Sequence, residues 1–262
     1  MDVSAHIDTL RVEGTRLGAA AALTGPDARV PTCPDWAVRD LVYHQGGVHR
    51  WATAYVEGGH TEPGAVDFSS ARGPLPADPD LFGWFLSGHA ALVETLAGAR
   101  PDLQCWTFLP APSPLAFWAR RQAHETTIHR VDAEFAAGAP LSVIGSDVAA
   151  DGIDELLVGF GPARGRRKED AEQQPAVIAV RCTDLEAGWT VRLGPDGVIA
   201  ERAQGTSDIP GTDLNSHTTS TCAVRGTAAD LYLTLWRRRA PETLTLEGNG
   251  DALNRLLERA RI

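Results

Sequence analysis

Four segments in the first 137 residues carry apolar side chains at helical spacing, and this pattern constrains the fold more than any other feature. The segments run over residues 2–23, from about 36 to the Gly58–Gly59 pair, over 80–99 and over 115–137. Stretches rich in Gly and Pro separate them, and the longest covers residues 60–79. Four helices of about 20 residues with long connections favour a four-helix bundle.

The second half of the chain changes character. Residues 147–160 predict one more helix, and residues 161–174, rich in charge, Gly and Pro, predict a domain boundary. Short strands follow at 175–182, 189–193, 198–202, 217–225 and 243–247, with a hairpin turn at 194–197 and helices at 227–238 and 251–260. We therefore predict an α+β protein with a helical domain at 1–160, a linker at 161–174 and a small α+β domain at 175–262.

Composition excludes several function classes. Lys and Arg number 24 against 34 Asp and Glu, and a formal net charge of −10 argues against a nucleic-acid partner. The polar N-terminus does not resemble a signal peptide, and no run of about 18 apolar residues predicts a membrane span. The four cysteines lie far apart without a CxxC pair, which is typical of reduced thiols in a cytoplasm.

The fourth segment carries a possible metal-binding pair. Glu125 and His129 are four residues apart, so on a helix they lie on one face with Cβ atoms about 6 Å apart. His124 is five residues from His129, about 140° around the helix, and cannot share an ion with it. The sequence HETTIH therefore lacks the spacing of an HExxH zinc protease.

The second segment could supply a third ligand. His49 shares a stripe with apolar residues that include Val42 and Ala52, so it points into the predicted bundle. A His-Glu-His set is typical of catalytic zinc, which keeps a fourth position open, although Ni, Fe or Mn suits the same ligands. The spacing alone is also compatible with a hydrogen-bonded core histidine and an ordinary Glu–His pair on a helix.

Four stretches, in this order, resemble the mycothiol-dependent maleylpyruvate isomerase family, whose bundle belongs to the DinB-like superfamily. They are VPTCPDWAVRDLVYHQGGVHRW (30–51), FWARRQAHETTIHRVDAE (117–134), ADGIDELL (150–157) and VRGTAADLYLTLWRR (224–238). The resemblance implies a DinB-like four-helix bundle followed by a domain of the sterol-carrier type. It also implies that His49, Glu125 and His129 ligate zinc or another divalent metal.

The same resemblance implies a role for an arginine near the C-terminus. The Arg of the family's LWxR stretch corresponds best to Arg238, although Arg237, Arg238 and Arg239 run together and leave the register open by one. Arg238 is expected to act on the substrate by clamping a carboxylate, and Arg237 and Arg238 are expected to contact the bound thiol. The alternative is a charged helix C-terminus favoured by the helix dipole.

The resemblance implies that mycothiol, a small thiol of actinobacteria, is activated at the metal for attack on an electrophilic small molecule. The outcome could be cis–trans isomerisation or S-transfer. Two alternatives stay open: a non-catalytic small-molecule binder, and a zinc hydrolase that uses metal-bound water. We expect no nucleic-acid or membrane partner, and a monomer or weak dimer.

Overall fold

The computed structural model describes residues 1–163, 165, 174–203 and 222–260. The chain forms two compact units, Met1–Val143 and Ile144–Ile262. This division lies earlier in the chain than the expected linker at 161–174, of which residues 164 and 166–173 lie outside the described residues.

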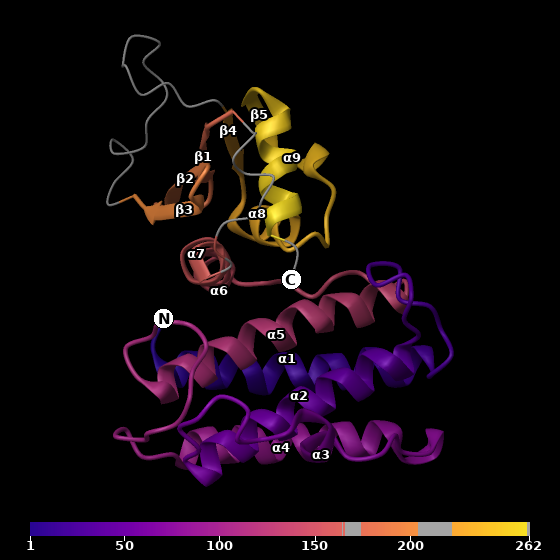
Figure 1. Cartoon of the computed structure of the whole chain (residues 1–262). Helices are drawn as coiled ribbons and strands as arrows, with labels where there is room; N and C mark the ends of the chain where they lie inside the picture. Colours follow the sequence, from indigo (N-terminus) through magenta and orange to yellow (C-terminus); the bar gives the residue numbers. More distant parts are fainter. Residues whose placement is uncertain (164, 166–173, 204–221, 261–262) are drawn as a thin grey trace. The chain divides into compact units, whose positions relative to one another are not determined.

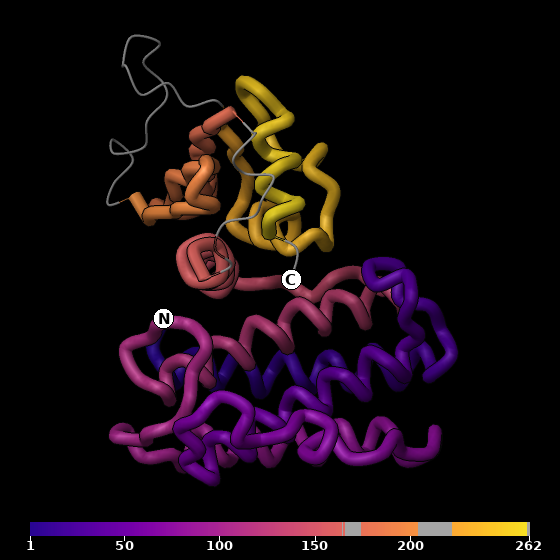
Figure 2. The backbone as a smooth tube through the Cα atoms, in the orientation of Figure 1, coloured from indigo at the N-terminus to yellow at the C-terminus, as the bar shows by residue number. Residues whose placement is uncertain are grey.

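Four long helices build the first unit: α1 (Val3–Thr24), α2 (Val38–Gly58), α4 (Asp78–Gly98) and α5 (Pro114–Ala136). They lie alongside one another, with α1 packed on α5 and α4, and α2 packed on α4 and α5 (Figure 1 and Figure 2). A short helix, α3 (Phe68–Arg72), lies within the long connection and packs on α2. The predicted four-helix bundle is confirmed. The helix α3 was not predicted, because five residues are too few to show the helical spacing of apolar side chains.

Local polar groups fix where these helices begin and end. The Asp2 carboxylate accepts a hydrogen bond from the Ala5 N–H (2.8 Å), and the Ser113 hydroxyl accepts one from the Ala116 N–H (3.1 Å). Gly59 ends α2 in the left-handed conformation (φ 57°, ψ 34°), which glycine adopts without steric cost. The helix α2 begins at Val38, two residues later than predicted, because Ala37 still pairs with Arg29 in a β-bridge.

The core of the bundle draws on all four long helices. One cluster of its buried side chains contains Leu17, Ala21, Val30, Val38, Leu41, Val42, Leu81, Phe85 and Ala133. Each fully buried leucine, valine or phenylalanine contributes roughly 1.5–3 kcal/mol relative to an exposed one. With this apolar core, we expect the bundle to fold without a bound ion.

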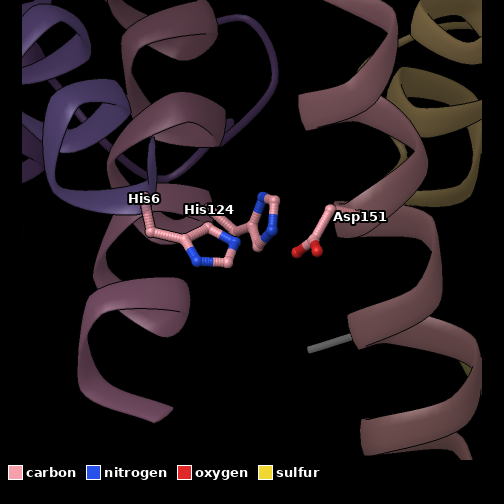
Figure 3. A group of neighbouring side chains, drawn as sticks. All are labelled: His6, His124 and Asp151. Carbon is pink, nitrogen blue, oxygen red and sulfur yellow. The ribbon is translucent and has the colours of Figure 1, made fainter. Parts of the chain in front are cut away.

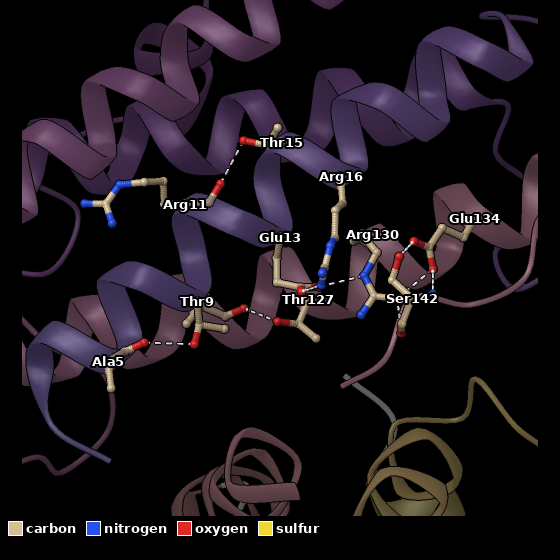
Figure 4. A network of polar contacts seen from close by, with 11 residues as sticks. Ala5, Thr9, Arg11, Glu13, Thr15, Arg16, Thr127, Arg130, Glu134 and Ser142 are labelled. Carbon is tan, nitrogen blue, oxygen red and sulfur yellow. Dashed lines mark hydrogen bonds and ion pairs between the residues drawn. The ribbon is translucent and has the colours of Figure 1, made fainter. Parts of the chain in front are cut away.

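A buried ion network crosses the same bundle between α1 and α5 (Figure 4). The fully buried Arg130 donates from Nε to Glu13 Oε2 and from Nη1 to Glu134 Oε2, both at 2.6 Å. Glu134 also accepts hydrogen bonds from the backbone N–H and hydroxyl of Ser142, which fixes the chain just after α5. One cation between two carboxylates compensates charges that would be costly to bury alone.

Among its described residues, the second unit contains a five-stranded sheet with the strand order β3-β2-β1-β4-β5. Its strands are β1 (Ala176–Cys182), β2 (Gly188–Gly194), β3 (Gly197–Arg202), β4 (Cys222–Gly226) and β5 (Thr245–Gly248). β1 and β4 are parallel, and the other neighbours are antiparallel. The predicted α+β class is confirmed; of the strand predicted at 217–225, residues 217–221 lie outside the described residues.

Helices complete this unit: α6 (Ser146–Asp154), the π-helix η1 (Glu155–Phe160), α7 (Gly161–Ala163), α8 (Ala228–Leu235), the 3₁₀ turn η4 (Pro241–Thr243) and α9 (Gly250–Arg259). The sequence predicts residues 147–160 as part of the helical domain at 1–160, but α6 packs on α8 and η1 packs on β3. Indole N–H groups make this attachment specific: Trp236 donates to the Gly152 carbonyl (3.2 Å) and Trp189 to the Asp154 carboxylate (3.1 Å). The composition of the sequence predicts a boundary at the charged stretch after this helix. It does not indicate these hydrogen bonds, because their partners lie far apart in the sequence.

Within the part of the chain that the structure describes, no helix combines the length and the apolar character that crossing a lipid bilayer requires.

The ion network of Arg130 predicts a large stability effect. Arg130→Ala removes the one fully buried cation of this network, which leaves Glu134 with only its hydrogen bonds from Ser142 and Glu13 with only the more exposed Arg16. We therefore expect the free energy of unfolding of the bundle to fall by about 3–5 kcal/mol. Urea unfolding followed by far-UV circular dichroism measures this change. Arg100→Ala is the matched control, because Arg100 pairs with Asp102 in an exposed ion pair and its loss should leave the urea midpoint unchanged. Equal midpoints for the two variants would contradict the prediction.

Candidate functional site

A stripe of ionisable side chains follows one face of α5. Arg121, Glu125 and His129 are spaced by four residues, and Asp132 follows by three, so all four lie on adjacent turns of one face. Glu125 Oε1 lies 3.4 Å from His129 Nε2. The predicted pairing of Glu125 with His129 is therefore present in the folded chain.

The third residue of the cluster is His44 on α2. Its Nε2 atom lies 3.5 Å from Glu125 Oε1, and one ligand atom from each of His44, Glu125 and His129 lies within 4.8 Å of the others. The structure thus brings together two of the three predicted metal ligands and adds His44 in the place expected for His49.

His49 instead lies in the interior of the bundle. It is fully buried, and its Nε2 atom lies 2.9 Å from both Gln45 Nε2 and Thr126 Oγ1. Burial, together with the nearby His89, holds the pKa of His49 well below its usual range, so the ring is neutral at pH 7. His44 and His49 are five residues apart, about 140° around α2, so both cannot face Glu125.

Asp132 fixes the orientation of His129. This fully buried carboxylate lies 2.9 Å from His129 Nδ1 and accepts a hydrogen bond from the Thr32 hydroxyl at 2.5 Å. A carboxylate only accepts, so Nδ1 carries the proton and Nε2 faces Glu125. Trp36 packs against the rings of His129 and His44, with centroid distances of 5.9 and 5.0 Å, and forms an aromatic wall.

The electrostatics of the cluster couple its members. Burial would raise the pKa of Glu125, but hydrogen bonds from His129 and His44 and the charge of Arg121 hold it well below its usual range. Burial alone would lower the pKa of His129, yet its bonds to Asp132 and Glu125 raise it to about 9. Glu125 is therefore a carboxylate at pH 7, as a metal ligand must be.

The cluster fits a divalent ion. Two ligand atoms each about 2.1 Å from an ion, at a tetrahedral angle, lie about 3.4 Å apart. The Glu125 oxygen lies at 3.4 and 3.5 Å from the two imidazole nitrogens. Two nitrogens and one oxygen form a donor set of the kind that zinc, nickel, iron and manganese accept.

His124 lies apart from this cluster, as its position on α5 predicted. Its ring contacts that of His6 on α1 edge to face, with centroids 6.0 Å apart (Figure 3). The phase argument that separated His124 from His129 is thereby confirmed, and the HETTIH motif contributes only its Glu and its second His to the cluster.

The three consecutive arginines after α8 differ in their surroundings. Arg239 forms an ion pair with Asp230, and Arg238 donates from Nη1 to the Trp236 carbonyl at 2.9 Å. Arg237 is exposed and has a left-handed backbone (φ 64°). The backbone N–H of Arg237 donates to the Thr234 carbonyl, and the backbone N–H of Arg238 donates to the Leu233 carbonyl. This is the pattern of a Schellman cap, in which glycine is the usual residue at the position that Arg237 occupies.

Arg237 at this cap position predicts a stabilising substitution. Arg237→Gly removes the Cβ that opposes the left-handed conformation, so we expect the second unit to gain up to about 1 kcal/mol of unfolding free energy. Arg237→Ala is the control, because it removes the charge and keeps the Cβ, and it should give no gain. Thermal unfolding of the three proteins tests this, and equal gains for Gly and Ala would show that charge, and not backbone strain, sets the stability here.

Comparison with known proteins places the chain in one family. The sequence profile of the mycothiol maleylpyruvate isomerase N-terminal domain matches residues 7–134, and that of the MDMPI C-terminal domain matches residues 147–255. No curated protein matches the chain.

Two solved structures share the fold. One is a crystal structure of the mycothiol-dependent maleylpyruvate isomerase in a histidine-to-alanine mutant form (13% identity, TM-score 0.61), and the other is a crystal structure of that isomerase (12%, 0.58). Each match covers 94% of this chain and 93% of the solved chain. At this level of identity, the likeness establishes the fold over both units.

Proposed function

Because the chain belongs to the mycothiol-dependent maleylpyruvate isomerase family, we propose that it is a metal-dependent enzyme that uses mycothiol to act on an electrophilic small molecule. The observation that carries this proposal is the convergence of His44, Glu125 and His129 at distances suited to one divalent ion. Three protein ligands of this kind are typical of catalytic zinc and leave a position for a further ligand.

Each ligand would be held in place by the bundle itself. His44 comes from α2, while Glu125 and His129 come from successive turns of α5, so packing of α2 on α5 sets their separation. Asp132 keeps the Nδ1 proton of His129, which leaves Nε2 as the donor atom. His129 would have to release its Nε2 proton to hold an ion. Zinc is the first choice for this donor set, and another divalent metal suits it as well.

A divalent ion at this site supplies a Lewis acid that lowers the pKa of a thiol and makes thiolate available at neutral pH. The thiolate of mycothiol would add to a conjugated double bond of the substrate. Rotation about the resulting single bond and departure of the thiolate give cis–trans isomerisation, whereas a stable thioether gives S-transfer. We propose that Arg238, with Arg237 beside it, contacts the thiol and clamps a substrate carboxylate.

Single substitutions of the two histidines on α2 distinguish the ligand sets. We expect His44→Ala to lower the affinity for zinc by more than about 100-fold, because it removes a direct ligand. His49→Gln should leave the zinc content unchanged, since the glutamine amide can replace Nε2 in its hydrogen bond to Thr126. Metal analysis of the purified proteins and zinc competition measure both. If His49→Gln loses zinc and His44→Ala keeps it, the result would support His49, Glu125 and His129 as the ligands, as the sequence predicts.

Calorimetric titration with mycothiol tests the proposed function. We expect metal-loaded protein to bind mycothiol at least about 10-fold more tightly than metal-stripped protein or Glu125→Ala, because the thiol would lose its contact with the ion. Equal affinities would place the sulfur elsewhere, and no binding in any form would favour a non-catalytic binder or a zinc hydrolase. Product analysis then separates an isomerase, which returns free thiol, from an S-transferase, which leaves a thioether.

A further inference from the structure

The two carboxylate oxygens of Glu125 have different partners. Oε1 lies 3.4 Å from His129 Nε2 and 3.5 Å from His44 Nε2, whereas Oε2 accepts a hydrogen bond from Arg121 Nη2 at 3.0 Å. Arg121 is one helical turn before Glu125 and His129 is one turn after it. The carboxylate is therefore held from one side by a guanidinium while its other oxygen faces both imidazoles.

Burial distinguishes this ion pair from an ordinary helix-surface pair. The Arg121 side chain is 5% exposed, whereas Arg16, which pairs with Glu13 three residues before it on α1, is 42% exposed. An exposed pair exchanges freely with water and contributes little to geometry. A buried guanidinium keeps its hydrogen-bond acceptors, and Glu125 Oε2 is one of those of Arg121.

We infer that Arg121 is a positioning residue that occupies Glu125 Oε2 and so presents Oε1 alone to the metal ion. This inference rests on the proposed function. A carboxylate bound through one oxygen fills one coordination position, whereas a carboxylate bound through both oxygens would take the position that the thiol needs. Arg121 thereby keeps a coordination position available for mycothiol without contacting either the ion or the thiol.

This role complements that of Asp132 along the same face of α5. Asp132 holds the far nitrogen of His129, and Arg121 holds the far oxygen of Glu125. An anion orients the imidazole and a cation orients the carboxylate, so both ligands on α5 have their inner atoms directed toward His44.

The test uses cobalt(II) in place of zinc, because its visible absorption reports the coordination number without any measurement of activity. The variants are Arg121→Met, which removes the donor, Arg121→Lys, which keeps the charge without the planar fork, and Arg120→Met, the same change on the neighbouring face of α5. We expect wild type and Arg120→Met to show intense bands of four-coordinate cobalt. Arg121→Met should show weaker bands of higher coordination number, with Arg121→Lys between them.

Affinities provide the second readout. Freed of Arg121, Glu125 should bind the ion in altered geometry, and we expect cobalt affinity to change by about 10- to 100-fold in Arg121→Met. Mycothiol should also perturb the cobalt bands of wild type and not those of Arg121→Met. If Arg121→Met fails to fold by circular dichroism, Arg121→Lys carries the comparison.

The outcomes separate the two proposals. If both Arg121 variants match wild type in their cobalt spectra and in their response to mycothiol, the positioning role is overturned and the proposed function is left intact. Wild-type protein that does not bind cobalt would overturn the metal-dependent function, and the inference with it. A change in Arg120→Met as large as in Arg121→Met would show a general effect of charge on α5 and would also overturn the positioning role.

Discussion

The hydrogen bond between His129 and the buried carboxylate of Asp132 is the interaction on which the candidate site depends. It keeps a proton on Nδ1 of His129 and so directs Nε2 toward Glu125 and His44. Asp132 is itself held by the Thr32 hydroxyl, from the segment between α1 and α2. A rotation of this one imidazole would remove the donor atom that defines the cluster, so the site requires the bundle to be folded around Asp132.

Helix α5 tolerates its many buried ionisable groups because they are compensated in two separate sets. On one face, Arg130 lies between Glu13 and Glu134. On another, Arg121 pairs with Glu125, and His129 pairs with Asp132. Burying a charge without a partner is costly, so these two sets restrict which helices can pack against α5 and in which register. The same constraint that makes the bundle specific thus also aligns the ligand atoms.

Most of the fold could be predicted from the sequence, because helical spacing, turn residues and strand alternation are local signals. The pairing of Glu125 with His129 was predictable for the same reason, since both residues lie on one helix. Which histidine of α2 lies beside Glu125 was not predictable, because it depends on how α2 is rotated against α5. Sequence pattern identified the most buried stripe of α2 and placed His49 on it correctly.

The stripe that is buried deepest is not the one that lies beside Glu125. His49 is fully buried, whereas the side chain of His44 is 33% exposed. The proposed ion would have to be reached by substrate, which favours ligands at the edge of the core, where the partly exposed His44 lies beside Glu125. The boundary between the two units was not predictable from the sequence for a similar reason. The indole hydrogen bonds of Trp189 and Trp236 attach α6 to β2 and to the end of α8, which both follow later in the sequence.

The segment between α1 and α2 links the stability of the bundle to its candidate site. Val30 belongs to the apolar core, Thr32 bonds to Asp132, and Trp36 packs on both histidines of the cluster. Cys33 adds a longer contact from its sulfur to Asp132, at 3.8 Å. These contacts come from seven consecutive residues, so the anchoring of Val30 also holds the hydroxyl and the indole that surround His129. A single short segment therefore both orients His129, through the bond of Thr32 to Asp132, and covers one side of its ring with Trp36.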